Sequence, residues 1–599
     1  MNAPTELASQ TYTLDEALDV ARHHYRRRDL GRARRVCKAI LASAPTHVPT
    51  LELVCQLALV DRQADGSLPA IEIALAERPD FAALYFLRGK LLHALGRKSD
   101  AVASLESARE LGFGADALRL IADIRLEMGD EKSAVKAYDE ALALEPSAPD
   151  LLSNRGSLLK RMGRLDEALS SHRAAVAASP SSPDLLNNLA NTLQAMGRNE
   201  EALQVFDQIL VIESGSASAR RGRAVSLMRM GRPVQAAEAF AWLVHRGYRD
   251  PAILQAWSMC LRDTGRHREA LQAIDHALTF MPDNPELLAQ RGLLLMTVGR
   301  MAEGLPLYEH RWGSEFFAPN ERDRFPALQR WTGEHSPAGH TVLLHAEQGL
   351  GDTIHFCRYA RHLAEAGASV LLEVDPSLVS LIATLSPNVS VIGRGESLPE
   401  FDLHCPLMSL PWAWMRLTGQ LNHFSNVQGY LRADSAKVEA WRDRLVTGAS
   451  GPWVGLVWRG RASHRNSAQR DIALAKLLHS LPSGPRYVSL QRDLSDEERS
   501  LLAARGDVAC VGDDLNDFSD AAAVCVLLEQ LVSVDTSVAH LAAALGRPVS
   551  LLVPFSADWR WQVSGTQSEW YPSVTLCRQA AWGAWDAALA AMSSRLPVA

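Results

Sequence analysis

A repeat of about 34 residues limits what this chain can fold into more than any other feature. Glycine recurs once in each unit, at Gly31, Gly96, Gly129, Gly163, Gly197, Gly231, Gly265 and Gly299. Six units have an alanine five residues after this glycine, at Ala101, Ala134, Ala168, Ala202, Ala236 and Ala270. Prolines keep the same register at Pro45, Pro79, Pro146, Pro180 and Pro282. A unit of this length is a pair of helices that buries its apolar faces only by stacking on its neighbours. We therefore expect an α-solenoid over residues 14–312, of about nine units, with Gly66 near the turn of a degenerate second unit.

The spacing of glycine, alanine and proline resembles the tetratricopeptide repeat (TPR). In such a unit the glycine permits the turn after the first helix, the alanine allows close helix approach, and the proline ends the second helix. The concave face of a TPR array binds segments of other proteins. Asn154 and Asn188, each nine residues before a glycine, and Asn191 are candidate acceptor-binding residues, because an amide offers a peptide both a donor and an acceptor. Exposed polar residues without a ligand are the alternative, since the next two units have Gly222 and Ala256 at this position.

The repeat ends after Glu309, and a proline-rich connector follows over residues 313–337. Beyond it, short apolar runs alternate with amphipathic stretches, which is typical of an α/β fold. The expected strands are one that begins at Thr341, then Ser369–Val374, Val389–Gly393 and Phe401–Leu407 in a first layer over residues 338–435, and Trp453–Trp458, Tyr487–Gln491, Val508–Gly512, Leu531–Asp535 and Ser550–Phe555 in a second layer over residues 451–599. The expected fold class is therefore α followed by α/β, a solenoid joined to two Rossmann-like halves.

Two strand-to-helix turns carry the residue types of a binding site. In the second half, Asp535, Thr536 and Ser537 lead into a helix that contains His540. Small residues at a helix N-terminus leave N–H groups free where the helix dipole favours an anion, so we expect a phosphate there, bound by the N–H groups of residues 536–539. A crossover helix that binds nothing is the alternative. In the first half, Gly349 and Gly351 form a glycine turn in front of Asp352.

These turns resemble those of the heptosyltransferase-like group of glycosyltransferases with the two-domain GT-B fold. Gly351 and Asp352 match the Gly-Asp that follows the first strand in that group, and Asp535, Thr536 and His540 match its donor-binding turn. Ser537 stands where that group usually has glycine. The resemblance implies donor contacts from Arg470, in place of a phosphate-binding lysine, with Arg459, Arg461 and Arg465 as neighbouring candidates, and from Gln491. Arg560, between Trp559 and Trp561, either lies near the donor or only packs.

A TPR array joined to such a domain resembles bacterial TPR-containing protein glycosyltransferases, in particular those that modify flagellin. The resemblance implies that the repeats hold flagellin or another protein acceptor, partly through an asparagine ladder, while the α/β half transfers a sugar to Ser or Thr. It also implies a nucleotide-sugar donor, CMP-linked in the case of a nonulosonic acid such as pseudaminic acid. Two other functions stay open: a TPR scaffold with an inactive transferase domain, and a heptosyltransferase-like enzyme that acts on a glycan.

Asp352 is the expected general base, because it follows the C-terminal end of a strand, which is where active sites of open α/β folds lie. The alternative is that its carboxylate only caps the following helix, a role that aspartate favours. The leaving phosphate needs positive charge, which we assign to Arg470 and to His540, although His540 has a purely structural alternative.

Charge and composition exclude several functions. The formal net charge of −7 gives no general basic field for nucleic acid. The eight cysteines form no CxxC pair, and neither an Asp-x-Asp strand end nor a zinc-like histidine spacing is present, so we expect no metal and no cofactor. No signal sequence or apolar run of about 18 residues is present, so we expect a cytoplasmic protein without a membrane span. TPR arrays often self-associate, and a homo-oligomer stays open.

Overall fold

The computed structural model describes residues 13–61, 66–314, 324–421, 429–445, 451–461 and 467–597. The chain forms two compact units, Met1–Ser226 and Leu227–Ala599. The boundary falls inside one helix of the repeat array, so the second unit contains the last repeats together with both α/β layers.

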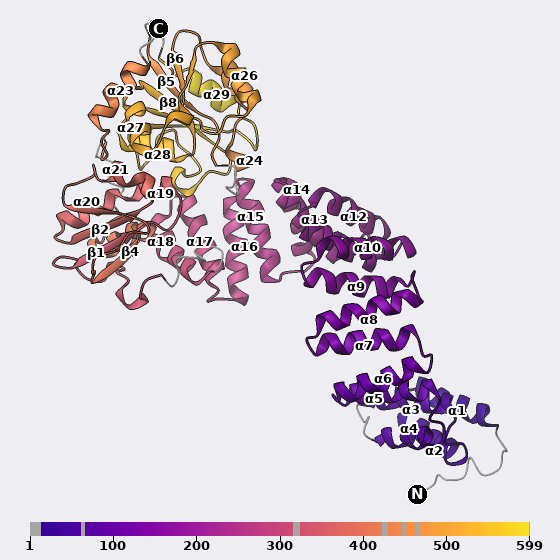
Figure 1. Ribbon diagram of the computed structural model, residues 1–599. Coiled ribbons are helices and arrows are strands. Elements are labelled where there is room, and N and C mark those ends of the chain that lie inside the picture. Colours follow the sequence, from indigo (N-terminus) through magenta and orange to yellow (C-terminus); the bar gives the residue numbers. More distant parts are fainter. Residues whose placement is uncertain are drawn as a thin grey trace. The chain divides into compact units, whose positions relative to one another are not determined.

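The first unit is a stack of helix pairs (Figure 1). Its helices are α1 (Leu14–Arg26), α2 (Leu30–Ser43), α3 (Val48–Asp61), α4 (Leu68–Glu77), α5 (Ala82–Ala94), α6 (Lys98–Glu110), α7 (Ala115–Glu127), α8 (Glu131–Leu144), α9 (Pro149–Arg161), α10 (Leu165–Ala178), α11 (Pro183–Ala195), α12 (Asn199–Ile212) and the start of α13 (Ala217–Arg229). Gly96, Gly129, Gly163 and Gly197 turn the chain within each pair with φ of 74 to 81°. Ala101, Ala134, Ala168 and Ala202 are fully buried, as the repeat pattern predicts.

The first two repeats depart from the predicted turns. Arg28, with φ of 60°, takes the left-handed position that glycine has in later repeats, whereas Gly31 lies inside α2. The prediction that Gly31 makes this turn is therefore wrong by three residues. Gly66 lies two residues before α4 and does not have a positive φ. A side chain in this conformation, as at Arg28, carries a steric cost that glycine avoids.

The second unit begins with the remaining repeats, α14 (Pro233–His245), α15 (Pro251–Asp263), α16 (His267–Phe280), α17 (Pro285–Thr297) and α18 (Met301–Tyr308). Gly231, Gly265 and Gly299 make the same turn, with φ of 69 to 82°. A 3₁₀ turn, η2 (Glu309–Gly313), continues α18 and ends the array.

The first α/β layer is a four-stranded parallel sheet in the order β3-β2-β1-β4. Its strands are β1 (Thr341–His345), β2 (Ser369–Val374), β3 (Val389–Gly393) and β4 (Leu403–Pro406). Its helices are α19 (Leu350–Phe356), α20 (Arg358–Glu365), α21 (Val379–Ile382) and α22 (Leu410–Thr418), with short 3₁₀ turns η4 (Pro376–Leu378) and η5 (Leu407–Ser409) and η3 (Ala327–Gln329) before the sheet. Because β1 pairs with both β2 and β4, the strand order reverses at β1, which places the loop after β1 at a topological switch point.

The second layer is a six-stranded parallel sheet in the order β10-β9-β8-β5-β6-β7, the doubly wound order of dinucleotide-binding folds. Its strands are β5 (Trp453–Val457), β6 (Arg486–Ser489), β7 (Val508–Cys510), β8 (Gln530–Val534), β9 (Val549–Val553) and β10 (Val574–Arg578). Its helices are α23 (Ser435–Leu445), α24 (Ser467–Arg470), α25 (Leu474–Ser480), α26 (Asp496–Arg505), α27 (Phe518–Leu527), α28 (Ser537–Ala544) and α29 (Asp586–Ser593), with 3₁₀ turns η6 (Gly512–Asp514) and η7 (Trp559–Trp561). Strand β10 was not predicted. The switch point lies between β5 and β8, so the loops after these two strands flank one crevice.

One apolar core joins the last repeat to both α/β layers. It joins Leu305 of the last repeat to Leu344 of β1 and, on the other side, to Leu551 of β9 and Trp559 of η7. The opposite face of the second sheet has its own core, which includes Leu552 and Leu589 of α29. Because one core is shared, the last repeat and both sheets hold each other in place. Within the residues described, no helix combines the length and apolarity needed to cross a membrane.

Candidate active site at the junction of the two sheets

The turns after β1 and β8 lie against each other. Helices α19 and α28, which follow these strands, are packed together. A Cβ atom at Gly351 would lie 3.0 Å from Cδ2 of His540 and 3.4 Å from Cα of Ser537. Gly351 is therefore needed for the close approach of the two turns. The fold brings together the two sequence-predicted groups, the glycine turn with Asp352 and the segment from Asp535 to His540.

Asp352 lies in the first turn of α19, third after the N-cap residue Gly349. Its Oδ2 accepts the Gly349 N–H at 3.0 Å. Its Oδ1 makes an ion pair with the Arg560 guanidinium. The alternative of a helix cap is thus partly right. One carboxylate oxygen caps the helix from its third position, and the other binds Arg560 of the second layer.

Arg560 links the two layers. Its side chain is 6% exposed, and its guanidinium contacts Asp352 of the first layer and Asp558 of its own loop, the latter at 2.7 Å. It also lies over the rings of Phe356 and Trp559, 5.3 and 4.8 Å from their centroids. Burial acts to lower the pKa of Arg560, but the negative charges of Asp558 and Asp352 outweigh burial and raise it. Arg560 is therefore a buried, permanently charged cation beside the candidate base.

Asp535 directly follows β8 and lies near the same cation. Burial acts to raise the pKa of Asp535, but His540 and Arg560 together lower it, so the group is a carboxylate. Nε2 of His540 lies 3.6 Å from Oδ1 of Asp535, and Nδ1 of His540 lies 3.0 Å from the hydroxyl of Tyr571. The imidazole also stacks on Trp561, with 5.3 Å between ring centroids. Both nitrogens of His540 face protein groups, so in this structure His540 positions Asp535 rather than facing a ligand.

The Tyr571 hydroxyl is a buried hub between the layers. It lies 2.9 Å from Nδ1 of His355 in α19 and 3.0 Å from Nδ1 of His540 in α28. A hydroxyl has one proton, so it donates to one histidine and accepts from the other. If Nε2 of His540 carries the proton that faces Asp535, the Tyr571 hydroxyl donates to His540 and accepts from His355. Burial raises the pKa of Tyr571, which keeps the hydroxyl protonated for this role.

Thr536 is the N-cap of α28, and its Oγ1 accepts the Ala539 N–H at 3.4 Å. This N–H is one of those assigned to a phosphate from the sequence, and here a protein oxygen satisfies it. The N–H groups of Ser537 and Val538 lie in the first turn, where a helix provides no partner. They are the groups of this turn that an anion can bind.

Arg470 ends α24, and its side chain is 14% exposed. The guanidinium covers Gly460, where a Cβ atom would collide with it at 1.8 Å. The nearest carboxylate with which it pairs, that of Asp471, is 3.9 Å away, and among the described residues its Nε has no hydrogen-bond partner. Among the described residues Arg470 therefore has only weak contacts, and it stays a candidate for the donor phosphate.

Gln491 and Arg459, two further candidates for donor binding, have structural partners. Gln491 is buried, and its Oε1 accepts the Arg459 N–H at 3.2 Å. The Arg459 guanidinium binds Glu498 with contacts of 3.0 and 3.1 Å, which engages Arg459 within the fold. Arg461 is exposed, and Arg465 lies outside the described residues.

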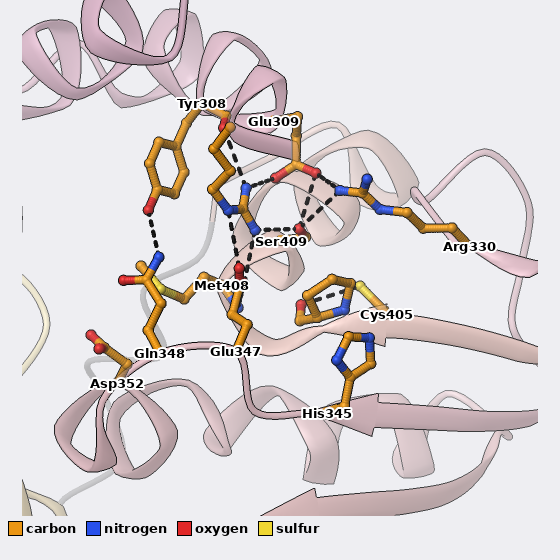
Figure 2. A network of polar contacts seen from close by, with 12 residues as sticks. Tyr308, Glu309, Arg330, His345, Glu347, Gln348, Asp352, Cys405, Met408 and Ser409 are labelled. Carbon is orange, nitrogen blue, oxygen red and sulfur yellow. Dashed lines mark hydrogen bonds and ion pairs between the residues drawn. The ribbon is translucent and has the colours of Figure 1, made fainter. Parts of the chain in front are cut away.

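The last repeat holds the glycine turn from the other side (Figure 2). The Gln348 amide donates to the Tyr308 hydroxyl at 3.1 Å. The Arg311 side chain is fully buried and binds Glu347 at 2.8 Å and Glu309 at 2.6 Å. Burial raises the pKa of Glu347, although Arg311 acts against this. The segment in front of Asp352 is therefore fixed by residues of the repeat array.

The connector contributes to the same network. Arg330 pairs with Glu309 and donates to Ser409 at 3.4 Å, and Trp331 is 1% exposed. Part of the predicted connector, including Phe316 and Phe317, lies outside the described residues.

The three candidate asparagines lie in the first unit. Asn154 is exposed on α9, and Asn188 and Asn191 lie half-buried on α11, the first helix of the next repeat. Asn188 donates to Ser153 of α9 at 3.0 Å, which links the two helices. In the part of the chain that the structure describes, no cluster of three or more histidine, cysteine, aspartate or glutamate side chains is placed to hold a metal ion.

Sequence comparisons find TPR repeats in the N-terminal half of the chain, ahead of the α/β region. TPR family models match residues 56–118, 119–183 and 159–211, and the model for the N-terminal TPR repeats region of Psidin matches residues 195–301. The chain is similar to Protein FlbA of Caulobacter vibrioides, with 26% identity over 364 residues, 56% of this chain and 59% of that protein. It is also similar to the photosystem I assembly protein Ycf3 of Prochlorococcus marinus, with 30% identity over 105 residues, 17% of this chain and 60% of that protein. The chain thus spans 59% and 60% of the length of these curated relatives.

Solved TPR structures match the repeats only in part. A MamA chain from Desulfovibrio magneticus is 20% identical, with 27% of this chain and 93% of that chain covered and a TM-score of 0.26. YrrB, described as a TPR protein with an unusual peptide-binding site, is 22% identical, with 30% and 94% covered and a TM-score of 0.26.

Proposed function

We propose that this chain is a metal-independent glycosyltransferase of the GT-B type that transfers a sugar from a nucleotide-sugar to a serine or threonine hydroxyl of a protein held by the repeats. The observation that carries the proposal is the contact between Asp352 and Arg560. A carboxylate from one doubly wound layer and a buried cation from the other meet beside the strand ends of both sheets. Direct displacement of a phosphate at a sugar carbon needs these two charges in one cleft.

The reaction needs a proton acceptor. In our account the acceptor hydroxyl oxygen attacks the anomeric carbon, its proton passes to the Asp352 carboxylate, and the phosphate of the donor leaves with the electron pair of the broken C–O bond. In this structure both carboxylate oxygens of Asp352 are engaged, Oδ2 by the Gly349 N–H and Oδ1 by the Arg560 guanidinium. The pair must therefore open before Asp352 accepts a proton.

A donor phosphate can open the ion pair between Asp352 and Arg560. Guanidinium groups bind phosphate oxygens in pairs, so the phosphate competes with Asp352 for Arg560. The N–H groups of Ser537 and Val538 and the loosely held Arg470 are further ligands for its oxygens. Gln491, through Arg459, fixes the loop after β5 on the same side of the crevice. In this account binding of the donor both places the leaving group and frees the base.

For the acceptor we propose flagellin, bound in the TPR groove with Asn154, Asn188 and Asn191 among its contacts, and for the donor a CMP-linked nonulosonic acid such as pseudaminic acid. The resemblance to flagellin-modifying transferases supports both identities. The fixing of the glycine turn by Tyr308 and Arg311 supports a shared role for repeats and site.

A scaffold with an inactive transferase domain is the second candidate, favoured by the ion pair that ties up Asp352. Co-production with flagellin in a cell that makes nonulosonic acid donors separates the two. Intact mass of the flagellin should rise in sugar-sized steps with this chain and stay unchanged with Asp352→Asn. Flagellin that binds the repeats but gains no mass with the unaltered chain would favour the scaffold.

A further inference from the structure

The first repeat carries a basic corner, which we define as Arg22, Arg26, Arg27, Arg28 and Arg32. All five side chains are exposed. They lie at the end of α1, in the turn and in the first turn of α2. The chain as a whole has a formal charge of −7, so this corner is positively charged in a protein whose net charge is negative.

Little of this charge is neutralised within the protein. Arg22 lies 3.5 Å from Asp19 and Arg32 lies 3.3 Å from Asp29. Arg26, Arg27 and Arg28 have no ion pair with any residue that the structure describes. Exposed pairs of the kind that Arg22 and Arg32 make contribute little, so the corner keeps most of its attraction for an anion.

Local helix electrostatics does not account for the corner. Arg26 at the end of α1 suits the negative end of the helix dipole, but Arg32 lies in the first turn of α2, where the dipole disfavours a cation. Charge on the terminal repeat of a solenoid favours solubility whether the charge is positive or negative. Neither reason calls for three consecutive arginines.

Arg28 also has an unfavourable backbone conformation. Its φ is 60°, whereas the equivalent residues in seven later repeats are glycines with φ of 69 to 82°. A side chain in this region carries a steric cost that glycine avoids. Strain that persists at an exposed position where glycine is used elsewhere points to a use for the side chain itself.

The corner borders a hollow. A cavity of about 220 Å³ between α1 and α3 is lined by Arg22, Tyr25 and Arg26 and, from the second repeat, by Glu52, Leu53 and Gln56, with Pro49 at the start of α3. The hollow lies between the first helices of two neighbouring repeats. Its mixed apolar and polar lining suits side chains of a polypeptide better than the flat surface of a bilayer.

We propose that the basic corner is a docking site for an acidic segment of a partner protein, separate from the candidate active site. The carboxylates of such a segment pair with the planar guanidinium groups, and one of its side chains enters the hollow. The proposal does not depend on the transferase function, because it rests only on the first two repeats.

Fluorescence anisotropy of a labelled glutamate-rich peptide with the full chain tests it. Binding should weaken as salt is raised from about 50 to about 200 mM, and Arg27→Glu/Arg28→Glu should weaken it about tenfold. The single change Arg28→Gly is the sharper test, because it removes strain and charge together. It should leave the melting temperature equal or higher while weakening peptide binding about threefold.

The matched control is Lys132→Glu/Lys136→Glu, which reverses two exposed charges on α8 and should leave binding unchanged. Three results would overturn the proposal: no salt-dependent binding by the unaltered chain, an equal loss in the control, or an Arg28→Gly protein that binds as before. Tighter binding of phosphatidylserine vesicles or duplex DNA with the same arginine dependence would overturn the assignment to a protein segment.

Discussion

Asp352 and Arg560 lie 208 positions apart in the sequence and form an ion pair between the two α/β layers, in which the arginine is buried and the aspartate half-buried. The carboxylate also caps the first turn of α19, and the guanidinium also binds Asp558. One pair thus joins the first layer, the second layer and the candidate base. It is both a structural contact and the group that the proposed chemistry has to open.

Replacing Arg560 by glutamine should destabilise the second unit strongly. The change leaves Asp352, Asp535 and Asp558 close together without their cation, and removal of one partner from a buried pair typically costs about 3–5 kcal/mol. Urea unfolding measures the loss. Arg444→Gln is the control, because Arg444 pairs with Asp514 at the surface and should hardly matter. Equal stability of the two variants would show that Arg560 is not the central cation described here.

Replacing Tyr571 by phenylalanine should also loosen the junction. The hydroxyl serves both His355 and His540, so its removal leaves two buried nitrogens without this partner, at about 1–3 kcal/mol for each group that stays unsatisfied. Tyr487→Phe is the matched control, since the Tyr487 hydroxyl donates to one carbonyl, that of Pro482, at 2.7 Å. If both variants lose the same stability, the hub at Tyr571 is worth no more than one ordinary hydrogen bond.

The last repeat should be inseparable from the α/β region. A chain of residues 217–599 keeps Tyr308, Glu309 and the shared core, and should fold. A chain of residues 311–599 loses the Glu309 carboxylate that Arg311 and Arg330 bind, together with the apolar side chains of α18, and should be insoluble or melt far lower. Circular dichroism melting compares the two. Similar melting temperatures would show that the network of Figure 2 contributes little to the fold.

His172 should make the first unit sensitive to acid. Burial lowers the pKa of His172 from 6.5 to about 4. The unfolded chain binds this proton first, so the stabilising effect is complete above about pH 6.5 and falls away towards pH 4, by about 3 kcal/mol. His172→Phe should abolish this dependence, because phenylalanine binds no proton. A phenylalanine should also fit there, since Phe206 occupies the same place over Gly222 that His172 occupies over Gly156.

The measurement is the difference in melting temperature between His172→Phe and the unaltered chain as the pH falls from 7 to about 4.5. We expect the melting temperature of His172→Phe to rise steadily relative to that of the unaltered chain as the pH falls. A difference that stays constant with pH would mean that His172 is already protonated in the folded state or is not buried as described.

Local features of the fold could be predicted from the sequence. The turn glycines from Gly96 onward and the buried alanines follow from contacts within one repeat, and the strands were found because each is a short apolar run. Strand β10 was missed, because its five residues lie between aromatic-rich loops that mask the pattern. The turn of the first repeat was misplaced because Arg28 adopts a conformation that a sequence pattern assigns to glycine.

The site was only half predictable. Turns after β1 and β8 are recognisable from a glycine, a carboxylate and a following helix, so Asp352 and Asp535 were found. Which side chain faces Asp352 depends on how the two layers pack. In the sequence, the only local feature of Arg560 is a positive charge between two tryptophans. The hub at Tyr571 was missed for the same reason, since its partners His355 and His540 come from two separate segments.

The most direct test of the central claim is a transfer assay with purified flagellin and nucleotide-sugar, read by intact mass, for the unaltered chain, Asp352→Asn and Asp558→Asn. Both variants remove one carboxylate from Arg560, but only Asp352 is the proposed base. We predict a rate loss of about 10²–10⁴ for Asp352→Asn and nearly full transfer by Asp558→Asn. Transfer by Asp352→Asn at the rate of the unaltered chain would contradict the account.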